Sequence, residues 1–314
     1  MQNLANSFVL LTAAKNEAKY IGVTIESVLR QSVLPKAWHI MDDGSTDETA
    51  DIVRRFARQH NFLHLHTIAS RNGGERNFGA QYRAINKAYS LVKAEAFEFV
   101  CMLDADIELK SNYYFRSIID EFERDADLGL AGGYIYERSG DIWKCRPANS
   151  PTSVAGGVQM FRRVCFDEID GYQALMYGGE DWLAQVHAQH AGWKVRSLLH
   201  LPVHHYRPTS SAGGRLKGIF RMGMRDASFG SHPAFELVKC ARRAREAPVL
   251  INPLVRLSGY FWYGLKHKSP VVPSDVVQTL RKEQIQRVFE WTKRPFNRFI
   301  SSDKALVGRD ESLR

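Results

Sequence analysis

An acidic pair, Asp104 and Asp106, directly follows the strongly apolar run 97–103. Two carboxylates separated by one residue can point into the same pocket once a strand has ended. Hard divalent cations prefer oxygen ligands and keep coordination positions open for phosphate groups. A cation held there would neutralise the charge of a departing diphosphate. We therefore expect Asp104 and Asp106 to be metal ligands, with Mn²⁺ or Mg²⁺ as the cofactor, although solvated aspartate pairs are also common in turns.

A second acidic pair, Asp42 and Asp43, stands after another short apolar run and before Gly44. Glycine and serine here explain a turn. Ser45 and Glu48 also have the spacing of a capping box, in which side chains satisfy the free N–H groups at a helix start. The turn leaves both carboxylates unexplained. We expect one of them to accept hydrogen bonds from a ribose or from a base N–H.

A third acidic pair, Glu180 and Asp181, follows Gly178 and Gly179 and precedes a helical stretch. Capping is one explanation, because the helix dipole favours negative charge at a helix N-terminus. The two glycines indicate a different one, a close approach of the backbone to a ligand or partner. A carboxylate placed there can act as the general base for an acceptor hydroxyl. The residues alone leave both explanations open.

Two histidines, His204 and His205, end an apolar run in the second half of the chain. Either one can complete the ligand shell of a metal ion or touch a diphosphate, since imidazole is a common metal ligand. A structural or exposed histidine pair is the equally simple alternative. We take His205 as the candidate third metal ligand.

Strand and helix signals alternate through the first half of the chain and must position these side chains. Apolar runs at 8–11, 38–41, 62–66 and 97–103 are typical of buried strands, and apolar residues at helical spacing lie between them. Repeated β–α units imply a parallel sheet with helices on both faces. Ligands bind such sheets beyond the carboxyl ends of the strands, where both aspartate pairs stand. Residues 128–206 look richer in strands around one helix.

Five sequence blocks together resemble the ordered motifs of glycosyltransferase family 2. They are Thr12–Glu17, Ile25–Gln31, Met41–Asp47, Asp104–Asp106 and Gly179–Asp181. The resemblance covers roughly residues 8–206. It implies an α/β fold of the GT-A type, which is a Rossmann-like, mostly parallel sheet flanked by helices. It also implies an inverting mechanism and a nucleoside-diphosphate sugar donor, UDP- or GDP-linked.

The resemblance assigns several residues to the nucleotide-sugar site. Glu17 matches a position near the nucleoside, and Asp43 matches the aspartate that binds the base. Ala13 stands where the family usually has proline, which alters the base pocket. Arg76 resembles the start of a basic helix in the family, so we expect it, or Arg83 after it, to contact the phosphates or base.

The same resemblance divides the other acidic residues between metal and acceptor. Asp104 matches the position near the ribose and diphosphate, Asp106 matches the metal-binding aspartate, and Ala105 lies between them in the nucleotide-sugar site. Asp181 matches the catalytic base. We expect Glu180 to bind the acceptor or to orient the loop.

Composition and chain features limit the class of protein. The chain has 314 residues, of which 44% are hydrophobic and 25% charged, as in an ordinary globular protein with a sizeable core. Its four cysteines are far apart, which argues against a disulfide framework or a zinc site. We find no signal-peptide pattern and no apolar stretch of the roughly 20 residues that a membrane span needs. The expected location is therefore cytoplasmic.

Positive charge is concentrated in the last hundred residues. Residues 215–314 hold 20 Lys and Arg against 9 Asp and Glu, although the whole chain has a net charge of only +9. We predict a GT-A catalytic domain over 1–214 and a basic, mainly helical and amphipathic extension over 215–314. The aromatic residues 260–263 beside lysines suit an anionic membrane, on the inner face of the cell membrane. A helical cap on the catalytic domain is an equal alternative, and nucleic-acid binding is disfavoured because no such module is visible.

The sequence thus predicts an inverting, metal-dependent glycosyltransferase that moves a sugar to an acceptor hydroxyl. Bacterial polysaccharide, glycolipid or other glycoconjugate synthesis is the expected setting, with a lipid-linked or saccharide acceptor. The Gln-x-x-Arg-Trp motif of processive synthases is absent, which favours a single addition. A sugar nucleotidyltransferase is the main alternative, but residues 12–17 lack its glycine-rich triphosphate loop. A non-catalytic GT-A-like binding domain is the other, disfavoured by the intact acidic motifs.

Overall fold

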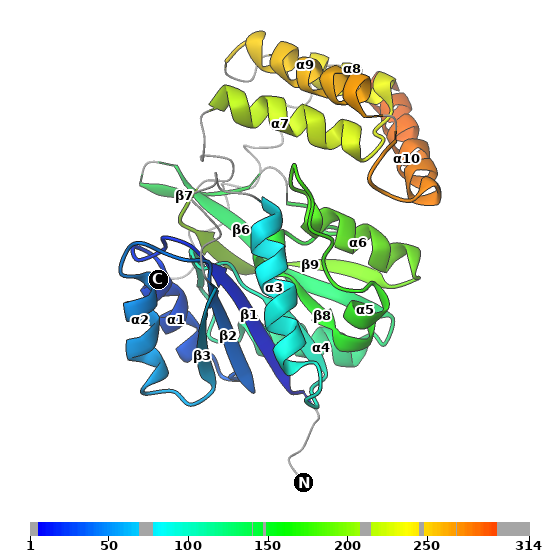
Figure 1. Ribbon diagram of the computed structural model, residues 1–314. Helices are drawn as coiled ribbons and strands as arrows, with labels where there is room; N and C mark the ends of the chain where they lie inside the picture. The colour runs from blue at the N-terminus through cyan, green and yellow to red at the C-terminus, as the bar shows by residue number, and fades with distance from the viewer. Residues whose placement is uncertain are drawn as a thin grey trace, which may run out of the picture. The chain divides into compact units, whose positions relative to one another are not determined.

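The structure is a computed structural model that describes residues 6–68, 78–139, 141–146, 149–207, 215–244, 248–267 and 269–293. The chain forms two compact units, Met1–Ser211 and Ala212–Arg314. The first unit contains a large sheet with helices packed on it, and the second is helical (Figure 1).

The first half of the first unit is a run of β–α units. Its elements are β1 (Phe8–Ala14), α1 (Ile21–Leu29), β2 (Ala37–Asp42), α2 (Thr49–Ala57), β3 (Leu63–Thr67), α3 (Phe78–Val92) and β4 (Phe99–Met102). The four strands are parallel and lie in the order β3-β2-β1-β4. The predicted β–α alternation is confirmed.

The second half adds strands of both directions to the same sheet. Its elements are β5 (Ile107–Leu109), α4 (Tyr114–Arg124), β6 (Leu128–Ser139), β7 (Ile142–Cys145), the short 3₁₀ helix η1 (Gly156–Val158), β8 (Met160–Arg162), α5 (Arg163–Glu168), α6 (Glu180–His190) and β9 (Lys194–His205). Strand β8 runs antiparallel between β4 and β6, while β6 and β9 are parallel. The sheet order continues from β4 as β8-β6-β9-β5.

A buried hydrogen-bond chain ties the centre of the sheet to the first acidic motif. The Trp38 indole N–H donates to the Thr12 hydroxyl at 3.0 Å, and that hydroxyl donates to the Leu103 carbonyl at 2.8 Å. All three residues are fully buried. Because buried polar groups are costly unless paired, this chain fixes the position of the residue just before Asp104.

The predicted capping box at Ser45 and Glu48 is wrong. Helix α2 begins at Thr49, and Glu48 makes no capping side-chain bond. The Ser45 hydroxyl instead accepts a hydrogen bond from the Asn16 N–H at 2.9 Å. The serine is used to join two loops rather than to start a helix.

The second unit is built from four helices, α7 (Arg215–Ser228), α8 (Pro233–Arg242), α9 (Ile251–Lys266) and α10 (Ser274–Lys293). Helices α7 and α9 pack closely, and α8 packs on α9. This agrees with the predicted helical extension. Within the described residues, none of the helices combines the length and apolarity needed to cross a membrane.

Candidate active site

The Asp104–Asp106 motif occupies the turn that links β4 to β5. The Leu103 N–H still bonds to the Leu11 carbonyl at 3.0 Å, and the Asp104 N–H bonds to the Gly157 carbonyl at 3.0 Å. The motif therefore stands where the parallel strands β1 and β4 end, as predicted. Asp106 is buried and Asp104 partly buried. Two carboxylates placed in this way are retained only if ions or hydrogen bonds satisfy them.

Strand register brings His205 to the same turn. Strands β5 and β9 are antiparallel, with Ile107 opposite His205, and the Tyr206 N–H donates to the Asp106 carbonyl at 3.0 Å. The Nε2 atom of His205 lies 3.3 Å from Oδ1 of Asp106. One ligand atom from each of Asp104, Asp106 and His205 lies within 4.8 Å of the others. We call these three residues the Asp–Asp–His cluster.

The Asp–Asp–His cluster fits a divalent cation by its donor set. The two carboxylates suit Mn²⁺ or Mg²⁺ in a site that also takes phosphate, and an imidazole nitrogen is a common additional metal ligand. The far ring nitrogen of His205, Nδ1, lies 3.6 Å from a carboxylate oxygen of Glu137 on β6. Metal-ligating histidines usually have such a carboxylate behind them, which orients the ring.

Charges around His205 alter its protonation. Burial alone lowers the pKa of His205, but hydrogen bonds to Asp106 and Glu137 outweigh it and raise the pKa to about 9. The ring is therefore protonated at neutral pH when no cation is bound. A cation that uses Nε2 must displace this proton.

Gly157 lies against the carboxylate of Asp104. A Cβ atom at Gly157 would stand 2.7 Å from Oδ2 of Asp104, closer than real Cβ contacts allow. On the other side, the Gln81 amide on α3 donates to Oδ1 of Asp104 at 2.6 Å. The carboxylate is thus held between a side-chain donor and a bare backbone.

Asp181 lies beside Gly156, the residue before Gly157. It occupies the first turn of α6, preceded by Gly178 and Gly179, whose φ values of 83° and 100° explain why both are glycines. The Gly156 N–H donates to Oδ2 of Asp181 at 3.1 Å. Since Gly156 and Gly157 are adjacent, one two-residue segment lies against both Asp104 and Asp181.

Glu180 faces away from solvent. Its side chain is buried, and its Oε1 accepts the Leu175 N–H at 3.1 Å. Holding the preceding loop is therefore the role that its contacts favour, which is one of the two roles predicted from the sequence.

The predicted nucleoside residues gather at the ends of β1 and β2. Partly buried Ala13 lies near the end of β1, opposite Met41. The Asp43 N–H bonds to the Ala14 carbonyl at 2.9 Å, and its carboxylate lies 3.6 Å from Lys15 Nζ. Asp42 is instead buried and accepts the Ser45 N–H, so Asp43 is the more accessible carboxylate of the pair.

Glu17 is buried and forms an ion pair with Arg207, just beyond β9. The Nε atom of Arg207 also lies 3.8 Å from Oδ2 of Asp106. This guanidinium links the predicted nucleoside end of the site to the Asp–Asp–His cluster. Ala105 is buried between the two aspartates, and its carbonyl accepts the Thr24 hydroxyl at 2.9 Å.

The model for "Glycosyl transferase family 2" matches residues 10–176, just over half of the chain. The chain belongs to glycosyltransferase family 2. The matched segment contains the Asp–x–Asp motif as well as Gly156 and Gly157. The predicted family is confirmed, and the chain is a glycosyltransferase.

Curated relatives match part of this transferase. A poly-beta-1,6-N-acetyl-D-glucosamine synthase from Staphylococcus epidermidis is 31% identical over 123 residues, which are 39% of this chain and 27% of the synthase. Glycosyltransferase GlyG from Streptococcus pneumoniae is 29% identical over 125 residues, covering 40% of this chain and 38% of GlyG. Each match therefore spans well under half of the relative's length.

Solved structures share the fold of this transferase. S. aureus TarS, crystallised with UDP-GlcNAc, has a TM-score of 0.52 and 18% identity, covering 69% of this chain and 65% of TarS. The mannosyltransferase PcManGT from Pyrobaculum calidifontis, bound to GDP-Man and Mn²⁺, has a TM-score of 0.54 and 15% identity, covering 91% of this chain and 83% of PcManGT. The predicted GT-A fold is confirmed.

Three residues of this family 2 transferase that contact the Asp–Asp–His cluster were not predicted as site residues: Gln81 beside Asp104, Glu137 beside His205 and Arg207 beside Asp106. The position of Arg207, two residues after His205, was the only available signal. The predicted phosphate contact Arg76 lies outside the described residues. Arg83 is exposed on α3, two residues from Gln81 and so on a different side of the helix.

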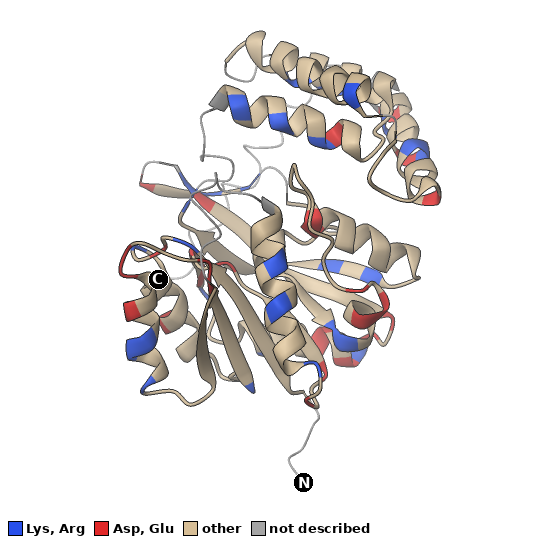
Figure 2. Ribbon diagram, viewed as in Figure 1, with Lys and Arg blue, Asp and Glu red and all other residues tan. Residues whose placement is uncertain are grey.

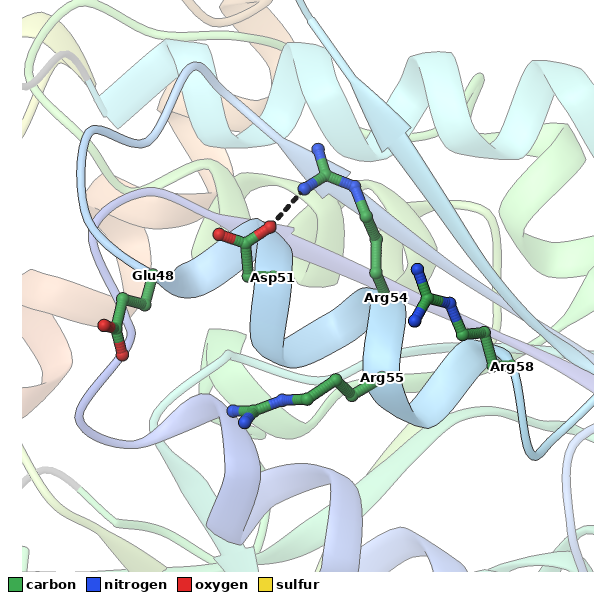
Figure 3. A pocket seen from close by; sticks show the side chains of 5 residues that line it. All are labelled: Glu48, Asp51, Arg54, Arg55 and Arg58. Carbon is green, nitrogen blue, oxygen red and sulfur yellow. Dashed lines mark hydrogen bonds and ion pairs between the residues drawn. The ribbon is translucent and has the colours of Figure 1, made fainter.

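A surface hollow on α2 is lined by charged side chains of that helix and of the residues directly before and after it (Figure 3). They are Glu48, Asp51, Arg54, Arg55 and Arg58. Asp51 and Arg54 form an ion pair at 2.5 Å. Because carboxylates stand among the guanidinium groups and partly neutralise them, we assign this hollow no part in catalysis.

Proposed function

We propose that the protein is an inverting, metal-dependent glycosyltransferase that moves a sugar from a nucleoside-diphosphate donor to an acceptor hydroxyl. The observation that carries this proposal is the pairing of two carboxylate positions across adjacent glycines. The Asp–Asp–His cluster lies on the Gly157 side, and Asp181 lies on the Gly156 side. Glycosyl transfer needs one group that stabilises the departing diphosphate and a second that takes the proton of the acceptor hydroxyl.

On the donor side, Asp104, Asp106 and His205 would hold Mn²⁺ or Mg²⁺. The cation supplies a Lewis acid that neutralises the departing diphosphate. Glu137 orients the His205 ring, and Gln81 fixes one oxygen of Asp104. These contacts hold the ligands in place before the donor arrives, which reduces reorganisation during the reaction.

On the acceptor side, Asp181 would remove the proton from the attacking hydroxyl. Its Oδ2 is held by the Gly156 N–H, and Oδ1 is the oxygen that we assign to the acceptor. The N-terminus of α6 favours the ionised carboxylate that a base must be. A base separate from the leaving-group site fits attack on the opposite face of the sugar, which inverts the anomeric centre.

For the nucleoside we propose Asp43, Glu17 and the backbone at Ala13, because they gather at the ends of β1 and β2. The bound UDP-GlcNAc of TarS and GDP-Man of PcManGT support a UDP- or GDP-linked sugar. Arg76 remains proposed for the phosphates. No partner role for nucleic acid is proposed.

The proposed acceptor is a saccharide or a lipid-linked hydroxyl in polysaccharide or glycolipid synthesis. The synthase named among the relatives supports polysaccharide chemistry. We further propose that the enzyme works in the cytoplasm, peripherally on the inner face of the membrane, with residues 1–214 catalytic and 215–314 providing the docking surface.

The test is a donor screen with the full chain. UDP- and GDP-sugars are incubated with Mn²⁺ or Mg²⁺, and release of nucleoside diphosphate and the anomeric configuration of the product are followed by NMR. The proposal predicts slow metal-dependent donor hydrolysis and, with an acceptor, an inverted linkage. Formation of a nucleotide-sugar from a triphosphate would identify a nucleotidyltransferase, and donor binding without turnover of any donor would identify a binding domain.

A further inference from the structure

Helix α9 of the second unit buries an arginine and exposes several large apolar side chains. Its buried side carries Arg256, which is 5% exposed, together with Gly259, Tyr260 and Tyr263. Its exposed side carries Leu254, which is 64% exposed. The other exposed apolar side chains of the helix are Ile251, Phe261, Trp262 and Leu265. A helix of a water-soluble protein normally has the opposite arrangement.

The buried face of α9 is held in place by contacts that do not involve these apolar side chains. Arg256 forms an ion pair with Asp226 of α7, which also pairs with Lys239 of α8 at 2.9 Å. Gly223 and Gly259 allow the helix backbones to touch, since a Cβ at Gly223 would stand 1.9 Å from the Arg256 carbonyl. Helices α7 and α9 are therefore joined by close backbone contact and buried charge, which leaves the apolar side chains of α9 on the outside.

The exposed apolar residues form one stripe. Positions 251, 254, 261, 262 and 265 recur at helical spacing. At about 1.5 Å per residue the stripe is about 20 Å long. Exposed Val249 and Leu250 extend it before the helix begins. Exposed Ser258 is the polar residue of this face. Scattered exposed apolar residues are ordinary, but a group gathered on one face of a helix indicates a binding surface.

Basic side chains flank both ends of the stripe. Lys266 Nζ lies 5.0 Å from the centre of the Trp262 ring. At the other end, the Leu250 N–H bonds to the Ala244 carbonyl at 3.0 Å, which places the start of the stripe beside Arg242 and Arg243 at the end of α8. Basic residues also recur along α7 (Figure 2).

We propose that the outer face of α9 lies in the interface of an anionic lipid bilayer, parallel to its plane. Aromatic and aliphatic side chains would enter the acyl boundary, while the flanking Lys and Arg meet acidic headgroups. The excess of 20 basic over 9 acidic residues in 215–314 makes the unit complementary to such a surface. The inference rests on the proposed function, which gives docking a purpose, and adds to it the helix face that meets the membrane.

The experiment is co-sedimentation of the full chain with vesicles of phosphatidylcholine alone and of an equimolar mixture with phosphatidylglycerol. The variant Trp262→Ser/Leu265→Ser removes two exposed anchors. The matched control Leu91→Ser/Val164→Ser removes exposed apolar side chains from the first unit. We expect binding to the anionic vesicles that weakens at high salt. The α9 variant should bind at least about tenfold more weakly, and the control should bind like the wild type.

Two further measurements separate the possible outcomes. One is sedimentation velocity in the absence of lipid, and the other is donor hydrolysis. Equal binding of wild type and α9 variant overturns the inference, as does equal binding to both vesicle types. A wild-type dimer that the α9 variant dissociates, without vesicle binding, identifies a second copy of the chain as the occupant and also overturns it. Donor hydrolysis should be unchanged in the α9 variant. Absent hydrolysis with normal vesicle binding would count against the proposed function alone.

Discussion

The Gly156 N–H donates a hydrogen bond of 3.1 Å to Oδ2 of Asp181, the proposed base. The next residue, Gly157, lies against Asp104, on the proposed leaving-group side, where an added Cβ would stand 2.7 Å from Oδ2 of the aspartate. One two-residue segment therefore sets the separation of the two carboxylates. Neither position tolerates a side chain, because a Cβ at either would come within 3 Å of a carboxylate oxygen.

Replacing Gly157 with alanine should reduce turnover strongly while the protein stays folded. The new Cβ would displace the Asp104 carboxylate, and a misplacement of about 1 Å costs roughly 10²-fold in rate. Donor turnover and the melting temperature are measured together. Gly22→Ala on α1 is the matched control, since its Cβ would meet nothing nearer than 4.0 Å. Similar turnover in the two variants would show that Gly157 does not set the position of the Asp104 carboxylate.

Replacing Asp181 with asparagine should lower transfer about 10²- to 10⁴-fold, the usual effect of losing a general base. Donor affinity measured by calorimetry should stay near wild type, because the donor contacts lie on the Gly157 side. Glu180→Gln is the comparison, and its effect should appear as a lower melting temperature through the loop bond to Leu175. If Glu180→Gln loses transfer and Asp181→Asn keeps it, the base is Glu180.

The histidine cluster on β2 and β3 should make stability depend on pH. Burial, followed by the nearby charges of His64 and His66, lowers the pKa of His39 from 6.5 to about 4, although Glu95 acts in the opposite direction. The unfolded chain therefore binds more protons below pH 6.5, so this stability is complete above pH 6.5 and is lost towards pH 4. Between pH 7.5 and 5 the loss is about 2 kcal/mol for His39 alone.

Urea unfolding of the wild type and His39→Gln at both pH values measures this effect. The free energy of unfolding of the variant should fall less between pH 7.5 and 5 than that of the wild type. His60→Gln, which alters a histidine outside the cluster, should keep the wild-type slope. Equal slopes for wild type and His39→Gln would assign the pH dependence to other groups.

Arg256→Met should destabilise the second unit. The substitution removes the buried cation beside Asp226 and leaves Lys239 and, at 3.7 Å, Arg225 as its partners. Breaking a buried ion pair costs about 3 kcal/mol. Hydrogen exchange of the α7 and α9 amides is the measurement, because it reports on this unit alone. Arg242→Met on α8 is the control. Exchange rates as slow as those of the control would mean that the ion pair contributes little.

Local patterns predicted the strands and the acidic motifs well. Apolar runs ending in aspartate mark strands β2 and β4, since buried strands of a parallel sheet are apolar throughout. The failure at Ser45 is instructive, because its spacing to Glu48 matches a capping box while its hydroxyl bonds to Asn16, 29 residues earlier in the chain. Short-range spacing cannot distinguish a helix cap from a bond between loops.

Contacts set by long-range register were predicted only in part, because His205 was a candidate metal ligand while the strand pairings that bring it and Glu137 to the site were not foreseen. His205 meets Asp106 because β9 pairs with β5, and Glu137 reaches His205 because β6 lies beside β9. Neither pairing leaves a mark on local sequence. The aromatic run 260–263 was interpreted as suited to a membrane surface, with no division among its members, but Tyr260 and Tyr263 are buried while Phe261 and Trp262 are exposed. Helical periodicity explains that division once the partner helix is known.

The most direct test of metal-dependent transfer at the Asp–Asp–His cluster is donor turnover as a function of Mn²⁺ concentration, in the wild type and in Asp106→Asn. Binding of Mn²⁺ is followed in the same samples by electron paramagnetic resonance. Wild-type turnover should rise with Mn²⁺ and vanish with a chelator. Asp106→Asn should keep its fold, bind Mn²⁺ far more weakly and turn over no donor at any tested concentration. Undiminished turnover by Asp106→Asn in the presence of the chelator would contradict this mechanism.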